Sequence, residues 1–132
     1  MKYILMMNTM KAGQENAGIL GWAKHDIEAH IAFMHKLNKE LKDAGEFVLA
    51  EGLSLPDQAK LVKAGKDGIP ITDGIFPESK EFLAGFWIVD VATSERAYAI
   101  AARISAAPGP GGVPLNMQIE VRPIMSAPKE EW

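Results

Sequence analysis

The stretch that decides the fold is FWIVDVATSERAYAIAARI, residues 86–104. It begins with four consecutive apolar or aromatic residues, Phe86 to Val89, which is typical of a central strand of a sheet. Thr93 or Ser94 then provides a hydroxyl group for the start of a helix. The apolar positions of that helix recur at steps of three and four residues, at Ala97, Ile100, Ala101 and Ile104. The stretch therefore predicts a strand followed by a helix whose small side chains let it approach the sheet closely.

A second strand and helix are predicted near the N-terminus. Residues 3–7 form an apolar run that favours a buried strand. From about Trp22 to Ala44, apolar residues return at helical spacing, at Ile27, Ile31, Met34, Leu37 and Leu41. Gly45 stands where a left-handed cap would end this helix, and residues 47–53 favour the next strand. The first half of the chain thus has the order strand, helix, strand.

A β-hairpin is predicted between the two halves. Residues 59–64 and 69–72 flank Lys66-Asp67-Gly68, and Asp-Gly favours the positive φ angles of a tight turn. After the second helix, residues 108–112 (PGPGG) predict a flexible connection, because proline and glycine propagate neither a helix nor a central strand. Residues 117–121 then form the last predicted strand.

The order of these elements predicts the fold class. A β-α-β unit, an inserted β-hairpin and a second β-α-β unit fit a ferredoxin-like sandwich of the α+β class, formed as a single domain over residues 1–132. With both helices on one face of a single sheet, the other face needs cover. We assign Trp87, Phe86, Met6 and Ile119 to that second face and expect a homodimer packed sheet to sheet.

Charge and cysteine content exclude several classes of function. Lys and Arg number 14 against 17 Asp and Glu, for a formal net charge of -3, so neither nucleic acid nor a membrane is an expected partner. The chain has no cysteine, which excludes a disulfide framework and a thiolate nucleophile. The apolar start at residues 1–8 is too short for a signal peptide or membrane span. We expect a cytoplasmic protein with no cofactor and no metal.

The central motif resembles that of a known family. Residues 73–81 read DGIFPESKE, followed by LAGFWIVDV at residues 83–91 and EVRPI at residues 120–124. Together with MKY at the start and EGL at residues 51–53, this pattern resembles the DGPF-type branch of the YCII-related proteins over nearly the whole chain. It differs from the family at Ile75, where proline is usual, and at Pro77, where a small residue is usual.

This resemblance implies a dimeric α+β-barrel fold and says less about activity. Members are mostly uncharacterised, some resemble accessory genes near extracytoplasmic-function sigma factors, and a few relatives look like small lyases acting on aromatic compounds. The broader YCII-related group is described as having a histidine–aspartate pair in a dimer cleft. The resemblance therefore directs attention to the histidines and carboxylates of this chain.

His30 and Asp26 are the candidate catalytic pair. On a helical wheel His30 falls near the centre of the apolar stripe, and Asp26 lies one turn before it. A carboxylate bonded to one ring nitrogen would raise the basicity of the other, as a general base requires. Alternatively, backbone groups satisfy a core histidine while Asp26 interacts with the helix dipole. His25 and His35 lie about 140° from His30, so no same-face zinc pair is expected.

Asp73 and Lys80 are candidate ligand-binding residues in the family motif. Asp73 is placed to contact a polar ligand, and Lys80 to pair with an anionic group or with Glu81. Asp73-Gly74 is equally a turn signature, in which the carboxylate accepts from a backbone N–H two residues on. The charged residues that follow fit a solvated surface turn as well.

Trp87 and Arg122 complete the set of candidate ligand-binding residues. Trp87 is a candidate wall of an aromatic-binding pocket, although a tryptophan in a central strand also suits the core or an interface. Arg122 is placed to reach a carboxylate ligand or to form an ion pair with Glu51 or Glu120 across strands. Both residues therefore have a structural alternative.

These observations predict a small polar or aromatic ligand in a cleft between the sheet and the first helix, lined by His30, Asp26 and Trp87. If the protein is an enzyme, His30 is the general acid/base, Asp26 orients it, and Arg122 or Lys80 stabilises charge. The alternative is a non-catalytic dimeric interaction module linked to transcriptional regulation. The sequence leaves open whether the protein is catalytic.

Overall fold

The computed structural model describes residues 1–10, 21–74 and 81–125. The first unit consists of β1 (Lys2–Met10), α1 (Lys24–Asp43) and β2 (Phe47–Gly52). A hairpin of β3 (Lys60–Ala64) and β4 (Pro70–Gly74) follows. The second unit consists of β5 (Glu81–Asp90), α2 (Ser94–Ser105) and β6 (Ile119–Pro123). Short 3-10 turns are η3 (Pro56–Gln58), η4 (Lys66–Gly68) and η5 (Pro110–Gly112).

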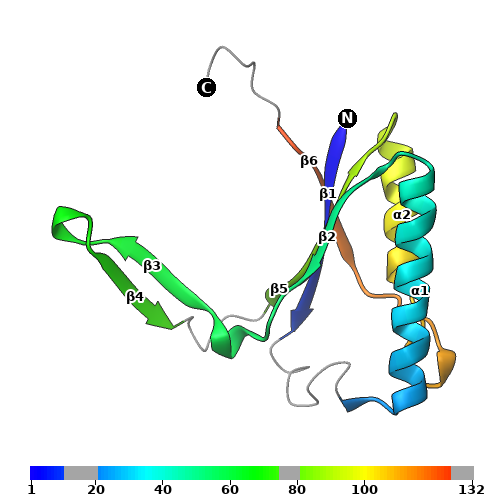
Figure 1. Cartoon of the computed structure of the whole chain (residues 1–132), viewed down its shortest axis with the longest axis horizontal. Helices are drawn as coiled ribbons and strands as arrows, with labels where there is room; N and C mark the ends of the chain where they lie inside the picture. Colours follow the sequence, from blue (N-terminus) through cyan, green and yellow to red (C-terminus); the bar gives the residue numbers. More distant parts are fainter. Residues whose placement is uncertain (11–20, 75–80, 126–132) are drawn as a thin grey trace.

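The main sheet has the order β2-β5-β1-β6, with every neighbouring pair antiparallel. Its two central strands, β1 and β5, are the apolar runs that open each half of the chain. Both helices cover the same face of this sheet (Figure 1). This arrangement confirms the predicted ferredoxin-like α+β fold with an inserted hairpin.

The helices form where the sequence predicts them, with one difference in the buried face. The hydroxyl of Thr93 accepts the Arg96 N–H at 3.2 Å and caps α2, and all four predicted inner positions of that helix are buried. In α1, Leu37 and Leu41 are buried, but Ile31 is 44% exposed. The stripe predicted for α1 is therefore wrong at Ile31, because the helix is turned so that Asp26 is buried instead.

The core lies between the helices and the sheet. Trp87 and Val89 of β5 face the helices together with their β1 partners, Leu5 and Tyr3. Trp87 and Ile119 were assigned above to the opposite face, and this assignment is wrong: Trp87 belongs to the core that the helices cover, and Ile119 is partly buried and packs against that core. A run of four apolar residues has no alternation from which to predict which side chains face inward.

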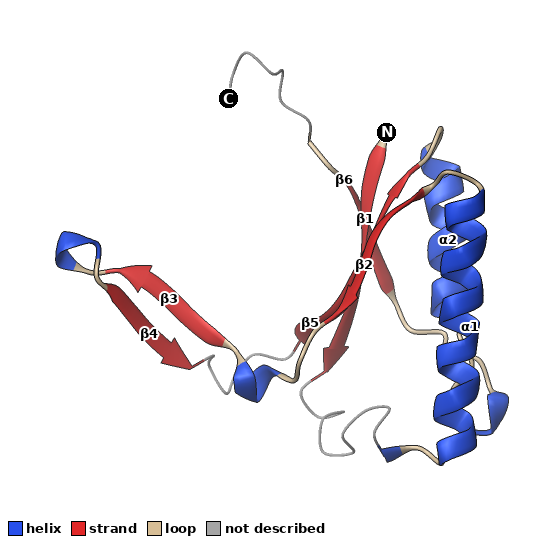
Figure 2. Ribbon diagram, viewed as in Figure 1, coloured by secondary structure: helices blue, strands red, loops and turns tan. Residues whose placement is uncertain are grey.

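Among the residues that the structure describes, no helix covers the face of the sheet opposite α1 and α2, which we call the open face. Met6 of β1 pairs with Phe86 of β5, and Ile4 pairs with Ile88, so these four side chains alternate away from the core. All four are half-buried. The hairpin of β3 and β4 projects from the body on the side of this open face (Figure 2). Its turn has the predicted geometry, with Asp67 at φ 63° and Gly68 at φ 77°.

Candidate functional site

A hollow forms where β6 separates from β1. β6 pairs with β1 only as far as Met7, which lies opposite Ile119. β1 continues to Met10 and pairs there with β5. On the β6 side the chain turns toward α2, where the Ser105 hydroxyl donates to the carbonyl oxygen of Met117. The two segments therefore diverge and leave a space between them.

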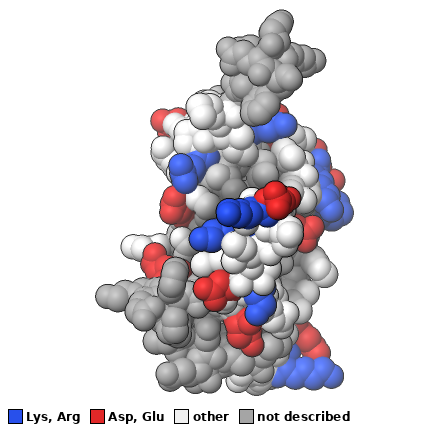
Figure 3. Space-filling view, turned by 90° about the vertical axis from the view of Figure 1, so that its left-hand side faces the viewer, with Lys and Arg blue, Asp and Glu red and all other residues white. Residues whose placement is uncertain are grey.

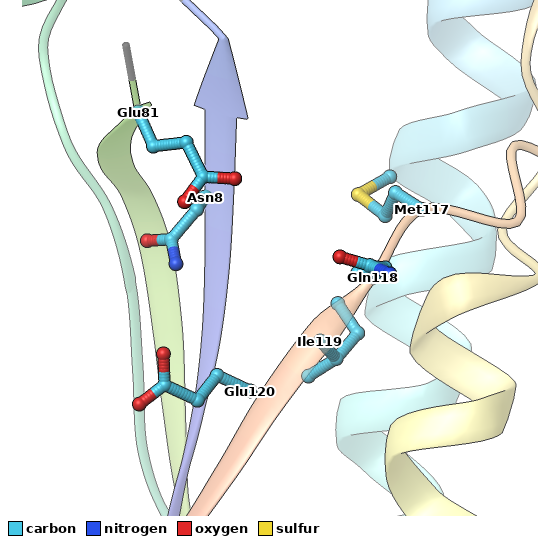
Figure 4. A pocket seen from close by; sticks show the side chains of 6 residues that line it. All are labelled: Asn8, Glu81, Met117, Gln118, Ile119 and Glu120. Atoms are coloured by element: carbon cyan, nitrogen blue, oxygen red, sulfur yellow. The ribbon is translucent and has the colours of Figure 1, made fainter. Parts of the chain in front are cut away.

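A bulge in β5 occurs at the same level of the sheet. Met7 is the partner of Gly85, but the next residue of β1, Asn8, is the partner of Leu83, so Ala84 is the extra residue. Such a bulge increases local twist and re-aims the side chains that follow it. Beyond the bulge, Asn8 and Glu81 face the hollow from neighbouring strands (Figure 4).

The hollow has a volume of about 690 Å³, within the range of about 300–1,000 Å³ that is common for small-molecule sites. The described residues that line it are Asn8, Glu81, Met117, Gln118, Ile119 and Glu120. In Figure 4 the side chains of Asn8, Glu81 and Glu120 lie on one side of the space and those of Met117, Gln118 and Ile119 on the other. Asn8 belongs to β1 and Glu81 to β5, while Glu120 follows Ile119 in β6. The lining combines two carboxylates and two amides with a thioether and an aliphatic side chain.

The sequence patterns do not single out this hollow. Glu81 and Glu120 were predicted only as ion-pair partners of Lys80 and Arg122, and the predicted first strand ends before Asn8. The space depends on how far β6 pairs with β1 and on the bulge in β5, which are both properties of long-range register. No local motif encodes them, although the alternation of apolar and polar residues at 117–120 indicates a segment with two different environments.

The catalytic candidates His30 and Asp26 both contact the loop between α2 and β6. His30 Nδ1 lies 3.0 Å from the carbonyl oxygen of Pro108. The Asp26 carboxylate accepts the Gly111 N–H at 3.2 Å and lies 3.3 Å from His25 Nε2. Within the described residues, His30 and Asp26 make no hydrogen bond to each other. The segment expected to be a flexible connection is therefore a hydrogen-bonded turn that α1 holds at two points.

These contacts fix the orientation and tautomer of the His30 ring. A backbone carbonyl only accepts, so Nδ1 carries the proton that is donated to Pro108. In the neutral imidazole Nε2 is then the unprotonated nitrogen. The Trp22 ring packs edge-on against His30, with ring centroids 5.4 Å apart and an interplanar angle of 86°. His30 is thus held by a backbone group on one side and an aromatic ring on another.

The other candidates lie apart from this pair. Trp87 is 7% exposed, and its Nε1–H donates to the Asn38 side-chain oxygen at 3.0 Å. The Asp73 carboxylate accepts the N–H of the next residue, Gly74, at 2.8 Å on the projecting hairpin. Arg122 Nε lies 3.9 Å from Glu120 at the exposed end of β6. Lys80 lies outside the described residues.

Two ion pairs join α2 to neighbouring elements, and neither pair lines the hollow. Arg96 donates two hydrogen bonds to Glu46, at 2.9 and 2.7 Å, and these bonds hold the pKa of the Glu46 carboxyl below its ordinary value. Arg103 donates to Glu40 of α1 and lowers the pKa of that carboxyl in the same way. Both pairs have structural roles, because they join α2 to α1 and to the start of β2.

Fold and hollow together define an α+β protein of ferredoxin-like architecture with a space of small-molecule size at one end of its sheet. The model of the YCII-related domain matches residues 1–114, and the chain belongs to the YCII-related family. No curated protein matches the chain significantly. Neither α1 nor α2, the helices of the described chain, is long and apolar enough to cross a membrane. In residues 1–10, 21–74 and 81–125, no group of His, Asp and Glu side chains is arranged to hold a metal ion.

Proposed function

We propose that this YCII-related protein binds a small polar or aromatic molecule in the hollow between β1 and β6. The observation that carries the proposal is the hollow itself, with its volume of about 690 Å³ and its mixture of polar and apolar walls. Binding sites for small molecules typically combine apolar walls with a few polar groups that orient the ligand. The ligand therefore has an apolar or aromatic body and at least one hydrogen-bond donor.

Charge narrows the class of ligand further. Glu81 and Glu120 contribute two carboxylates to the hollow, and no Lys or Arg is among its described lining residues. Carboxylates accept hydrogen bonds and attract cations, whereas an anionic ligand would be repelled. We therefore expect an amine or a neutral hydroxyl compound to bind more tightly than a carboxylate of the same shape.

Two chains form the proposed binding unit. Ile4, Met6, Phe86 and Ile88 leave an apolar strip on the open face of the sheet. Such a strip normally marks an interface, which supports a homodimer packed through these faces. A homodimer is also the basis of the alternative function, a non-catalytic interaction module linked to transcriptional regulation. The alternative requires no ligand in the hollow.

Acid–base chemistry at His30 is a second candidate function, favoured by the bond from Nδ1 to Pro108. A hydrogen bond to one ring nitrogen leaves the other nitrogen to act as the base. From the sequence, this orienting hydrogen bond was assigned to Asp26. In this version Pro108 orients the ring, and Asp26 positions the loop through Gly111. His30 is not among the described residues that line the hollow, so this chemistry would belong to a separate site.

Three matched probes test the binding proposal: benzylamine, benzyl alcohol and benzoate, each titrated against the full chain in a thermal-shift assay. A ligand that prefers the native state raises the unfolding midpoint. We expect benzylamine to raise it most and benzoate least. Chemical-shift changes at the side-chain amides of Asn8 and Gln118 would then locate the bound probe.

Variants that each remove one negative charge distinguish binding in the hollow from nonspecific attraction of a cationic probe to the acidic surface. Glu81→Gln and Glu120→Gln keep the shape of the lining and remove one charge each, so both should weaken benzylamine binding. Glu95→Gln, on the exposed surface of α2, removes the same charge elsewhere and is the matched control. Equal binding of benzoate and benzylamine, or equal effects of all three variants, would contradict the proposal. A stable dimer that binds none of the probes would favour the interaction module.

A further inference from the structure

The hairpin of β3 and β4 carries both Asp-Gly sequences of the chain, Asp67-Gly68 in its turn and Asp73-Gly74 at the end of β4. In such a sequence the glycine nitrogen can attack the Cγ carbon of the aspartate side chain, because glycine has no Cβ to hinder the approach. The five-membered ring that forms is a succinimide, which opens in water to aspartate or to isoaspartate. Each of the two sequences is therefore a candidate modification site.

The hairpin is set apart from the rest of the described molecule. It forms a sheet of its own and projects away from both helices (Figure 1). Every residue of its two strands is exposed. Figure 3 views the molecule from the side toward which the hairpin projects, and acidic and basic side chains are spread there among uncharged ones. A two-stranded hairpin is only marginally stable in water, so its backbone has the freedom that closure of a ring requires.

The two glycine nitrogens differ in their hydrogen bonds. The Gly68 N–H donates to the carbonyl oxygen of Gly65 at 3.2 Å, within the hairpin turn. The Gly74 N–H donates instead to Oδ1 of the Asp73 side chain, at 2.8 Å. Because Oδ1 is bonded directly to Cγ, this contact holds the Gly74 nitrogen close to the carbon that it would attack. The Gly68 nitrogen must first leave its turn.

The pairing of the two strands explains why the Gly74 N–H is available for this contact. The Gly65 N–H donates to the carbonyl oxygen of Ile69 at 2.8 Å, which makes these two residues a hydrogen-bonded pair. Hydrogen-bonded and non-hydrogen-bonded pairs alternate along an antiparallel ladder. Continued along the register, this alternation makes Lys60 and Gly74 a non-hydrogen-bonded pair. It also places Pro70, which has no N–H, where no ladder bond is needed. The Gly74 N–H therefore points away from β3.

We propose that Asp73 isomerises spontaneously to isoaspartate in the folded protein, in preference to Asp67. The Gly74 nitrogen forms a bond to Cγ of Asp73, and the carboxyl hydroxyl group leaves with the amide proton as water. Hydrolysis of the ring then takes up one water. Where this water adds to the main-chain carbonyl carbon of Asp73, the chain continues through Cγ and the former main-chain carboxyl group becomes free. The net change is an isomerisation that consumes no oxidant, reductant or cofactor.

Isomerisation would change the backbone at the base of the hairpin. The Cβ carbon of Asp73 becomes a backbone atom, so the chain is one atom longer immediately before Gly74. The pair that Gly74 forms with Lys60 is then lost, because the register no longer matches. The lengthened chain leads on to β5, whose first residue, Glu81, lines the hollow. The modification therefore loosens the connection between the hairpin and the main sheet.

Incubation of the full chain in neutral buffer at physiological temperature, followed over weeks, tests the proposal. Trypsin releases residues 67–80 as one peptide that contains both aspartates, so each sample supplies its own internal comparison. Electron-transfer fragmentation distinguishes isoaspartate from aspartate at each position. We expect isoaspartate to form at least about fivefold faster at Asp73 than at Asp67, which is the factor that corresponds to one hydrogen bond of the Gly68 N–H.

Unfolding and substitution test the structural cause of this preference. In guanidinium chloride the hydrogen bonds of the hairpin are lost, so the rates at the two aspartates should become equal. Gly74→Ala adds a methyl group at a position with no neighbouring heavy atom within 4 Å, so the variant should fold, as far-UV circular dichroism would show. The added methyl group hinders the approach to Cγ. The rate at Asp73 should then fall to the rate at Asp67 or below it.

Four results would overturn the inference. The first is an equal rate at both sites in the folded chain, or a faster rate at Asp67. The second is a ratio that unfolding leaves unchanged, because sequence alone would then set the rates. The third is isoaspartate that forms only in guanidinium chloride, which would mean that the fold protects Asp73. The fourth is a Gly74→Ala variant that isomerises at Asp73 as fast as the natural chain.

Discussion

Asp26→Ala is the substitution that best tests how α1 holds the loop between α2 and β6. Asp26 is the only buried charged residue in the described part of the chain, with 9% of its surface exposed. Its carboxylate accepts the N–H of Gly111, a residue with a φ angle of 68° that the turn requires. Removing the carboxylate therefore deletes the contact that holds the tip of the turn against the helix.

The magnitude follows from two contributions. A hydrogen bond to a charged group is worth about 1.5–3 kcal/mol, and the exposed Gly111 amide regains water in the variant, so we use the lower end of this range. An acidic side chain in the first turn of a helix adds about 0.3–1 kcal/mol through the helix dipole. We expect the free energy of unfolding to fall by about 2 kcal/mol, or the melting temperature by about 6–10 °C.

Urea unfolding at fixed protein concentration measures this change, with hydrogen exchange at the Gly111 amide as a local reading. Asp26→Asn keeps an oxygen acceptor and should lose about 1 kcal/mol. His25→Ala removes a partner whose side chain is 82% exposed and should change stability by less than about 0.5 kcal/mol. A loss below about 0.5 kcal/mol for Asp26→Ala, with unchanged exchange at Gly111, would refute the reasoning.

Three further substitutions test the core and its electrostatics. Ile104→Ala should lower the free energy of unfolding by about 2–5 kcal/mol, whereas Ile31→Ala, at a position 44% exposed, should have a much smaller effect in the same urea titration. Trp87→Phe leaves a half-buried amide oxygen on α1 without its donor and should cost about 1–3 kcal/mol, measured by thermal unfolding. Because the pKa of Glu46 is lower in the folded protein, its ion pair with Arg96 stabilises above the ordinary value of 4.5 and is lost as pH falls below it. Glu46→Gln should therefore flatten the acid side of the stability–pH profile, and an unchanged slope would contradict this assignment.

Much of the fold could be predicted because its signals are local. Thr93 caps α2, Gly45 ends α1 at a φ angle of 73°, and Asp67-Gly68 forms the hairpin turn, each through the chemistry of one or two residues. The order of elements then leaves few topologies for a single antiparallel sheet. The prediction failed where the pattern was ambiguous, since Phe86 to Val89 is apolar throughout and does not indicate which side chains face the helices.

The site was less predictable because its determinants are distant in sequence. The hollow requires that β1 extend beyond Met7, the last of its residues that pairs with β6. It also requires an extra residue in β5, at Ala84. Neither feature has a composition signal. His30 and Asp26 were recognised from their spacing on one helix, but their partners, Pro108 and Gly111, are backbone groups about 80 residues later. A backbone partner has no side-chain identity that a sequence motif could record.

The loop between α2 and β6 connects these two regions and affects how variants of His30 must be interpreted. Its first part is held by His30 and Asp26, and the same segment continues to Met117, which lines the hollow and accepts a hydrogen bond from Ser105. A change at His30 can therefore weaken ligand binding by moving the wall of the hollow, without His30 touching the ligand. Loss of binding alone does not identify His30 as a catalytic base. A catalytic role for His30 requires a reaction step whose rate depends on protonation of Nε2. That dependence must be lost in a His30 variant in which the loop between α2 and β6 keeps its position.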